Sequence, residues 1–238
     1  MERLRKRQEQ LLESLANSEM AEQFYFGGGS ALAMFDLKHR LSVDLDFFSV
    51  EKISPEALEY AKNIIIQTFP EVSISYHKHY DRHIFTLTFE DNTHLELEFV
   101  RYPARRFYPS KHKIGQMEVE HSGDIFLDKL ATIAMRNEIK DFVDIVAYIE
   151  KYGVAWDETI RLAEQKHKMA GLAHILACKF NTPLFDENTY KSLGYSQSFK
   201  TIISQLKKYA EEIVREIVRR NKRTQKESAE NTKFIGHG

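Results

Sequence analysis

Cysteine and long apolar runs are both scarce in this chain of 238 residues. The single cysteine, Cys178, excludes an internal disulfide and a cysteine-rich zinc site. Because Cys178 follows an apolar stretch, we expect it to be buried and unreactive. No run of eighteen apolar residues occurs, and the charged N-terminal segment does not resemble a signal peptide. We therefore predict a cytoplasmic protein that makes no membrane contact.

A strong charge of either sign is also absent, because 34 Lys and Arg balance 35 Asp and Glu. The net charge of −1 gives no bulk indication of a nucleic-acid partner. Two segments are locally basic: residues 99–117 contain no acid, and residues 200–226 hold nine Lys or Arg against three Glu. Either segment could contact phosphates, but a basic loop and a solvated helix face explain them as simply. The first segment also carries aromatic residues able to stack: Tyr102, Phe107 and Tyr108.

Glycine is infrequent, yet three glycines stand together at residues 27–29 and are followed by Ser30. A short apolar strand is predicted before them and a helix over residues 30–39 after them. Backbone N–H groups of such a turn, at the positive end of a helix, can receive phosphates. The Walker A sequence and the dinucleotide-binding fingerprint are both absent. Taken alone, a glycine run is usually only a flexible turn.

Two carboxylates follow this turn on a strand predicted over residues 43–48. Leu45 and Phe47 point to one face, so Asp44 and Asp46 must point to the other. At a separation of about 6.5 Å, their repulsion costs roughly 2 kcal/mol at an effective dielectric of 20. Mg²⁺ (or Mn²⁺) would relieve it, since such ions bind one or two carboxylates together with substrate phosphates. Solvated acids at a strand end are the simpler explanation of the pair alone, but beside the glycine turn it predicts metal-assisted phosphoryl or nucleotidyl transfer.

A further strand, predicted over residues 94–100, places Glu96 and Glu98 on one face. Either glutamate could add a third carboxylate to the metal site, or both could be ordinary surface residues. In the helix predicted over residues 122–137, Lys129 and Arg136 are seven residues apart and therefore lie on one side. Both could face a triphosphate. Lys129 would offer a single point charge, and the guanidinium of Arg136 could donate two hydrogen bonds to one phosphate. Asp141 could equally cap the next helix or serve the active site.

Two blocks of the sequence resemble signatures of the AbiEii/AbiGii-type nucleotidyltransferase toxins. The first is Gly28-Gly29-Ser30 followed by His39-Arg40-x-Ser42-x-Asp44-x-Asp46-Phe. The second comprises Lys129-Leu, Arg136 and Lys140-Asp141-Phe-x-Asp144. The resemblance is strong over residues 24–48, returns over residues 124–144 and fades after about residue 155.

This resemblance implies a mixed α/β (α+β) fold, in which a nucleotidyltransferase-like sheet flanked by helices is followed by a C-terminal helical bundle. We expect the α/β core in residues 1–120, a helical region contributing Lys129 to the site in residues 121–223, and a flexible tail in residues 224–238. Within the core, further helices are predicted over residues 5–17 and 54–68, strands over 72–76 and 84–89, and an edge strand over 116–120. The later helices are predicted over residues 141–152, 155–176, 185–194 and 198–223.

The leading hypothesis is transfer of a nucleotide from an NTP to an acceptor. The glycine turn would bind the phosphates of the NTP. Asp44, Asp46 and Glu98 would hold the metal. Lys129 would neutralise the charge of the leaving pyrophosphate. Glu98 is the closer match to the third acid of nucleotidyltransferase folds, and it would otherwise take the proton of the acceptor hydroxyl. The predicted catalytic and metal residues are Asp44, Asp46, Glu98 and Lys129. The predicted nucleotide-binding residues are Gly28, Gly29, Ser30, Arg40, Ser42, Arg136 and Asp141.

The acceptor cannot be read from these residues. The family resemblance implies a bacterial toxin that modifies RNA, commonly at a tRNA end, within a toxin–antitoxin or phage-defence system and under restraint by an antitoxin protein. One alternative keeps the same site but modifies an antibiotic-like small molecule or a protein. A second alternative is a non-catalytic binding module of the same fold, which the presence of Ser30, Asp44, Asp46 and Lys129 disfavours.

Overall fold

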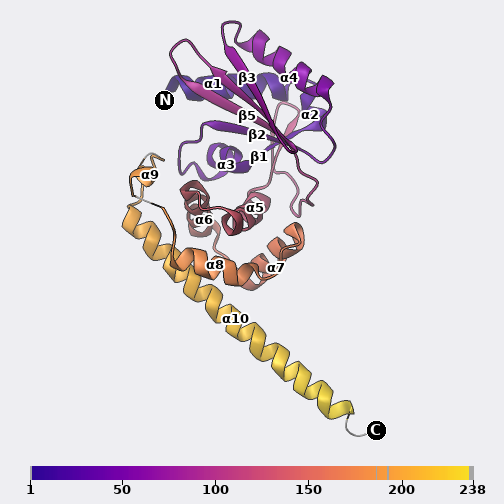
Figure 1. Cartoon of the computed structure of the whole chain (residues 1–238), viewed down its shortest axis with the longest axis vertical. Coiled ribbons are helices and arrows are strands. Elements are labelled where there is room, and N and C mark those ends of the chain that lie inside the picture. Colours follow the sequence, from indigo (N-terminus) through magenta and orange to yellow (C-terminus); the bar gives the residue numbers. More distant parts are fainter. Residues whose placement is uncertain (1, 186, 192, 236–238) are drawn as a thin grey trace. The chain divides into compact units, whose positions relative to one another are not determined.

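The protein was analysed as a computed structural model that describes residues 2–185, 187–191 and 193–235. The chain forms two compact units, Met1–Phe126 and Leu127–Gly238. All strands of the described chain belong to the first unit, and the second unit is helical (Figure 1). The predicted α/β class, with a mixed sheet flanked by helices, is therefore confirmed.

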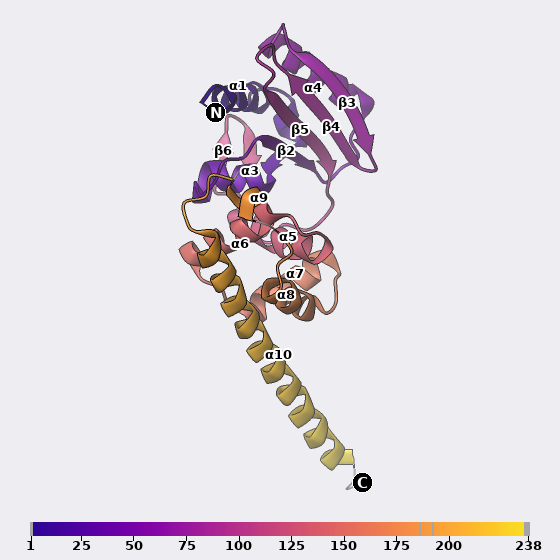
Figure 2. The same cartoon turned by 60° about the vertical axis from the view of Figure 1, so that its left-hand side comes forward.

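The first unit is built on a seven-stranded sheet with the order β3-β4-β5-β2-β1-β7-β6. Strands β3, β4 and β5 are antiparallel neighbours, β2 pairs with β5 in parallel, and β1 is antiparallel to β2 but parallel to β7. This arrangement is a mixed sheet that contains the antiparallel hairpin of β4 and β5 (Figure 2). The strands are β1 Tyr25–Gly27, β2 Asp44–Ser49, β3 Ser73–His79, β4 Arg82–Thr88, β5 His94–Arg101, β6 His112–Ile114 and β7 Met117–Val119.

The predicted edge strand at residues 116–120 is wrong in its position. The observed strand, β7, lies between β1 and β6, and β6 forms the edge instead. β6 is only three residues long and none of them is buried, so it has no apolar alternation to reveal it. The internal place of β7 comes from its parallel pairing with β1, which joins residues far apart in the chain.

One face of the sheet forms the core of the first unit. Leu45 and Phe47 of β2 and Leu97 and Phe99 of β5 are fully buried, and the rings of Phe47 and Phe99 stack at 5.1 Å. Helix α1 (Glu2–Ala16) packs against β5 and against α4 (Pro55–Thr68). The α4 N-terminus is capped by Ser54, since the Ala57 amide donates to the Ser54 hydroxyl at 3.2 Å.

The helix after the glycine turn begins two residues earlier than predicted. After the short α2 (Met20–Gln23) and β1, an α-helical turn α3 (Gly28–Ala31) continues as the π-helix η1 (Leu32–Leu37). Lys38 ends it in a left-handed conformation, with φ of 51°. Such π-helical segments are uncommon and no residue preference predicts one, so the sequence pattern indicated only a helix.

The second unit contains α6 to α10 and most of α5. One helical pattern predicted over residues 155–176 forms two helices, because Lys168 and Gly171 adopt positive φ values of 52° and 78° between them. The last helix continues to Ile235, although a flexible tail was predicted from Thr224; residues 236–238 lie outside the described chain. The helices are α5 Ser122–Met135, α6 Ile139–Tyr152, α7 Trp156–His167, α8 Leu172–Asn181, α9 Glu187–Lys191 and α10 Phe199–Ile235.

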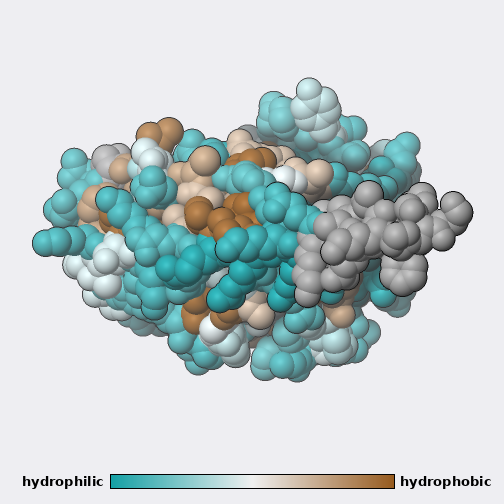
Figure 3. Space-filling view, turned by 90° about the horizontal axis from the view of Figure 1, so that it is seen from below, coloured by the Kyte–Doolittle hydropathy of each residue, from teal (hydrophilic) through white to brown (hydrophobic). Residues whose placement is uncertain are grey.

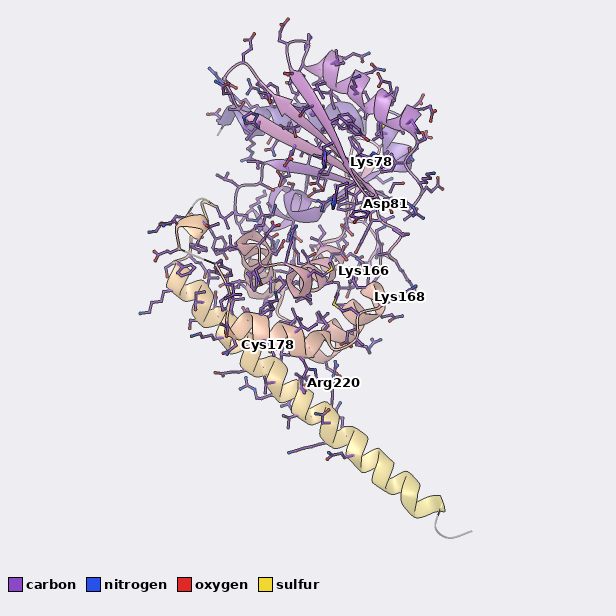
Figure 4. The ribbon with its side chains drawn as sticks, in the orientation of Figure 1. Lys78, Asp81, Lys166, Lys168, Cys178 and Arg220 are labelled. Atoms are coloured by element: carbon purple, nitrogen blue, oxygen red, sulfur yellow. The ribbon has the colours of Figure 1, made fainter. Side chains whose placement is uncertain are left out.

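The expected burial of Cys178 is wrong, because this residue is exposed on α8 (Figure 4). The buried stripe of α8 consists of Leu172, Ala173, Leu176, Ala177 and Phe180. Cys178 is adjacent to this stripe in sequence but does not share its spacing, so it lies outside the packed face.

The surface combines hydrophilic areas with smaller apolar ones, as seen from below in Figure 3. Exposed large apolar side chains include Met135 and Leu184, at 71% and 68% exposure. Within the described residues, no helix is both long enough and apolar enough to span a bilayer.

Candidate functional site

The glycine turn and the Asp-x-Asp strand are in direct contact. Gly28 has φ of +68°, in the left-handed region that favours glycine. A Cβ atom at Gly28 would collide with the Asp46 carboxylate, whose Cγ lies 3.0 Å from that position. The β1–β2 pairing also sets Gly27 opposite Asp46. The structure therefore brings together two features that the sequence predicts separately.

Two hydroxyls of the predicted site join the turn to the beginning of β2. The Ser30 side chain is 1% exposed, its Oγ lies 2.7 Å from Ser42 Oγ, and it donates to the carbonyl of Asp44. The Gln8 amide donates to the Ser42 carbonyl at 2.9 Å. These bonds fix the start of β2. Contact of Ser30 or Ser42 with a phosphate stays a prediction.

The acids of β2 and β5 share one face of the sheet. Along β2, Asp44 and Asp46 are partly exposed and alternate with buried residues, as predicted. The parallel register pairs Asp44 with Glu96 and Asp46 with Glu98. Four carboxylates thus lie side by side on two adjacent strands, where like charges repel and a bound cation would stabilise them.

Glu98, the predicted third metal ligand, forms an ion pair with Arg82 of β4. Arg82 donates from Nε to Glu98 Oε2 at 3.1 Å, and its terminal nitrogen contacts the same oxygen. In the part of the chain that the structure describes, no three His, Cys, Asp or Glu residues are grouped to hold a metal ion. The carboxylate oxygens of Asp44 and Asp46, beside a turn of backbone N–H groups, nevertheless form the donor set that Mg²⁺ prefers. Ligation by Glu98 stays a prediction.

Glu120 also belongs to this region, although sequence reasoning missed it. Its amide donates to the Phe26 carbonyl at 2.8 Å, and its side chain is only 5% exposed. A Cβ atom on Gly27 would lie 2.6 Å from Glu120 Oε2. Glu120 and Asp46 therefore approach the glycine turn from opposite sides. Only the parallel pairing of β1 with β7 brings Glu120 there, and no local pattern could have indicated it.

Arg40 lies between the turn and the acid strand. Its Nη1 donates to the carbonyl of Leu41 at 2.9 Å. This contact holds the guanidinium close to its own backbone, just before β2. The sequence left open whether Arg40 orients the strand or binds the nucleotide, and the contact is compatible with the first role.

The second unit gathers the other predicted site residues into a buried ion cluster. Lys129 Nζ lies 2.5 Å from Asp141 Oδ1 and 3.0 Å from Asp144 Oδ2. Arg136 donates from Nε to Asp141 Oδ2 at 2.8 Å and contacts Glu138 at 3.1 Å. Both side chains approach Asp141, as expected of a pair on one side, although α5 ends at Met135 and Arg136 directly follows it.

Charge and burial act oppositely on Asp141. Burial of its carboxyl disfavours the charged form, but the positive charges of Lys129 and Arg136 outweigh this effect and hold the Asp141 pKa below its ordinary value. Asp141 and Asp144 are both fully buried. Both carboxylates are therefore built into the helical unit as partners of cations.

Of the two roles left open for Asp141, capping of the next helix is wrong. Helix α6 begins at Ile139, its N-cap residue is Glu138, and no side chain caps it. Asp141 therefore lies in the first turn, where it pairs with Lys129 and Arg136 instead. The cap prediction failed because the polar Asp141 resembled a helix start, whereas the buried Ile139 already belongs to the helix.

A second buried ion pair in this unit was not predicted. Lys166 Nζ lies 2.7 Å from Asp128 Oδ1, and His167 Nε2 lies 3.0 Å from the same oxygen. The Lys166 side chain is fully buried on α7 (Figure 4). It joins α7 to α5 next to the Lys129 cluster, and its role there is to hold the two helices together.

Comparisons with known proteins identify the family of this chain. The family model described as nucleotidyl transferase AbiEii toxin, type IV toxin–antitoxin system, matches residues 10–227. This chain belongs to the AbiEii family. Its members carry the nucleotidyltransferase and toxin description that the two sequence blocks indicated.

Individual relatives are more distant. The uncharacterized protein aq_aa25 of Aquifex aeolicus (strain VF5) is 28% identical over 168 residues, which cover 71% of this chain and 78% of the relative. The crystal structure of JHP933 from Helicobacter pylori matches with a TM-score of 0.56 and 18% identity, over 94% of this chain and 96% of that one. The crystal structure described as that of a putative nucleotidyltransferase from H. pylori matches with a TM-score of 0.57 and 19% identity, over 91% of this chain and 96% of that one. These structures share the fold of the AbiEii chain.

Several residues of the basic segments of this AbiEii chain are paired with acids. Arg106 lies 2.8 Å from Glu118, and Arg220 of α10 lies 2.6 Å from Asp157 of α7. In contrast, Arg105, Lys111 and Lys113 are exposed near β6. The first basic segment therefore presents three positive side chains to solvent in addition to the paired Arg106.

Proposed function

We propose that this AbiEii-family chain is a metal-dependent nucleotidyltransferase that transfers NMP from an NTP to RNA and acts as the toxin of a toxin–antitoxin system. The observation that carries the proposal is the contact between the Gly28 turn and the Asp46 carboxylate. A turn that presents backbone N–H groups beside two carboxylates suits a substrate that combines phosphates with a cation.

In this proposal, the backbone of Gly28 and Gly29 receives the phosphates of the NTP. Asp44 and Asp46 hold Mg²⁺ (or Mn²⁺), which supplies charge neutralisation at the reacting phosphate when bound. Ser30 and Ser42 position the acid strand through their hydroxyl contacts. The acceptor hydroxyl attacks the α-phosphorus, its oxygen forms the new P–O bond, and the bond to pyrophosphate breaks.

Glu98 is the proposed acceptor of the hydroxyl proton or a further metal ligand, with Arg82 holding its carboxylate in place. Lys129 and Arg136 are proposed to neutralise the leaving pyrophosphate. Both bind Asp141, so this role requires that they exchange part of that contact for phosphate. Asp141 would then act by keeping the two cations oriented.

RNA is the proposed acceptor because Arg105, Lys111 and Lys113 are exposed on the first unit, where they can bind a phosphate backbone. Restraint by an antitoxin protein follows from the type IV toxin–antitoxin description of the family. A small molecule or a protein would need neither a basic surface nor a salt-dependent affinity. RNA binding that weakens steeply with salt therefore distinguishes RNA from these alternatives.

The test is to incubate the protein with each labelled NTP, Mg²⁺ and total RNA. We expect label in RNA with the unchanged chain, none after chelation of the metal, and none with Asp46→Ala. The matched control is Asp81→Ala, which removes an exposed acid from the β3–β4 hairpin (Figure 4). Transfer that survives Asp46→Ala would disprove the two-acid mechanism. Failure to label any RNA, with label entering a small molecule or protein, would favour the other acceptors.

A further inference from the structure

A row of aromatic side chains lies next to the acids on the same sheet face. The β1–β2 register pairs Tyr25 with Phe48, two residues along each strand from the Gly27–Asp46 pair. Side chains two residues apart on a strand share a face, so Phe48 lies beside Asp46 about 6.6 Å away along β2. The rings of Tyr25 and Phe48 stack at 5.6 Å with an interplanar angle of 26°.

Tyr102 extends this row from the end of β5. Its ring lies 5.7 Å from that of Phe48, and its amide donates to the Ser49 carbonyl at 2.6 Å. Phe48 and Tyr102 are half-buried, whereas Tyr25 beside them is buried. We call Phe48 and Tyr102 the aromatic shelf. Both residues are partly exposed, and Phe48 Cδ2 lies 2.8 Å from the position that a Cβ atom on Gly27 would take.

Neighbouring contacts hold the shelf in place. Arg106 lies 4.5 Å above the Tyr25 ring and pairs with Glu118 at 2.8 Å. The buried Asp124 carboxylate accepts hydrogen bonds from the backbone amides of Phe107 and Tyr108 at 2.9–3.0 Å. The segment after Tyr102 is therefore anchored at Phe107 and Tyr108. The rings of the shelf are held in position before a planar ligand binds.

We propose that the aromatic shelf stacks the base of the incoming NTP, an inference that rests on the proposed function. A nucleotide presents phosphates and, one sugar away, a planar base. The sheet face presents acids in one row and aromatic rings in the next row, and the glycine turn contacts the acid row at Asp46. Base–aromatic stacking is tolerant of base identity, because every base has a π-face. The shelf thus contributes affinity for NTPs in general.

The experiment measures fluorescence of 2-aminopurine riboside triphosphate, which is quenched by stacking, with the full chain and Mg²⁺ and no acceptor. Pyrrolocytidine triphosphate serves as the pyrimidine probe. Phe48→Leu and Tyr102→Leu keep apolar bulk but remove a ring, and Tyr102→Phe keeps the ring. The matched control is Tyr76→Leu, an exposed tyrosine that pairs with Phe85 on the opposite sheet face. Equilibrium dialysis with labelled NTP measures binding independently of stacking.

We expect quenching of at least one probe by the unchanged chain, Tyr102→Phe and Tyr76→Leu. Each leucine variant of the shelf should lose the quenching and raise the Kd for NTP by about tenfold. NTP binding without quenching, or quenching that persists in both leucine variants, would overturn the shelf while leaving the proposed function standing. If only a 2-aminopurine-labelled RNA is quenched, the aromatic shelf stacks bases of the acceptor instead of the NTP, and the inference is overturned. Absence of NTP binding in dialysis would overturn both proposals.

Discussion

The two units use carboxylates in opposite ways. In the first unit, Asp44 and Asp46 lie partly exposed on a sheet face, beside two glutamates of the neighbouring strand. In the second, Asp141 and Asp144 are fully buried around Lys129. Acids grouped on an open face repel one another and favour a bound cation, whereas buried acids must be neutralised by the protein itself. The same residue type thus forms the proposed ligand site in one unit and internal ion pairs in the other.

Deleting the internal cation should produce the largest loss of stability. Lys129→Met leaves Asp141 with Arg136 alone and removes the Lys129 contact of Asp144, so we expect the free energy of unfolding to fall by about 3–5 kcal/mol. Urea denaturation followed by circular dichroism measures this change. The control is Lys140→Met, which breaks a partly exposed pair with Glu138 and should cost at most about 1 kcal/mol. Equal losses in both variants would contradict the comparison.

The glycine turn allows a sharper test of the first unit. Gly28→Ala combines a positive φ with a collision against Asp46, and we expect a loss of about 2–4 kcal/mol. Gly171→Ala has a left-handed φ of +78° but open space around its Cβ, so it should cost only about 1–2 kcal/mol. The difference in denaturation midpoint between the two alanine variants measures the cost of the collision with Asp46. Adding Asp46→Ala to Gly28→Ala should recover part of it, and no recovery would show that Asp46 does not limit this position.

Acidification should destabilise the ion cluster by a smaller amount. The Asp141 pKa is lowered in the folded chain, so its contribution to stability is complete above the ordinary value of 3.8 and is lost as pH falls through the folded pKa. The loss should be smaller than that of Lys129→Met, because protonation of Asp141 leaves Lys129 paired with Asp144. Denaturation midpoints measured from pH 6 to pH 2 test this. With Asp141→Asn, the decline below pH 4 should become shallower, and an unchanged decline would assign it to other carboxyls.

The smallest effect on stability is expected at the open acid pair. Asp46→Asn keeps the shape that contacts Gly28 but removes one of two repelling charges, so the free energy of unfolding should change by less than about 0.5 kcal/mol. The same substitution should abolish nucleotide transfer. Thermal denaturation and the labelling assay on one preparation measure both effects. A loss of stability above about 2 kcal/mol would mean that Asp46 is primarily structural.

Sequence reasoning succeeded where the deciding interactions are local. The alternation in β2 placed its two acids opposite Leu45 and Phe47 because side chains on a strand repeat every two residues. The helix predicted from residue 54 begins there because the Ser54 hydroxyl caps it and Pro55 stands at its first position. Lys129 and Arg136 were placed together because seven residues make about two helical turns, and both bind Asp141 even though α5 ends one residue before Arg136. Each result needed only neighbours along the chain.

Prediction failed where partners come from distant segments. The Arg82 partner of Glu98 depends on the register between β4 and β5, and Glu120 reaches the glycine turn only through β7. The exposure of Cys178 depends on which stripe of α8 meets its neighbouring helices. No local pattern carries this information.

The sequence by itself determined the residue types of the candidate site, the face on which Asp44 and Asp46 lie, and the AbiEii signature that contains them. Local periodicity and turn chemistry suffice for these, because they act within a few residues. Only the tertiary structure decided that Gly28 touches Asp46, that Glu120 and the aromatic shelf border the same turn, and that Asp141 is an ion-pair partner instead of a cap. Such contacts depend on strand order and helix packing, which join residues that the chain keeps apart.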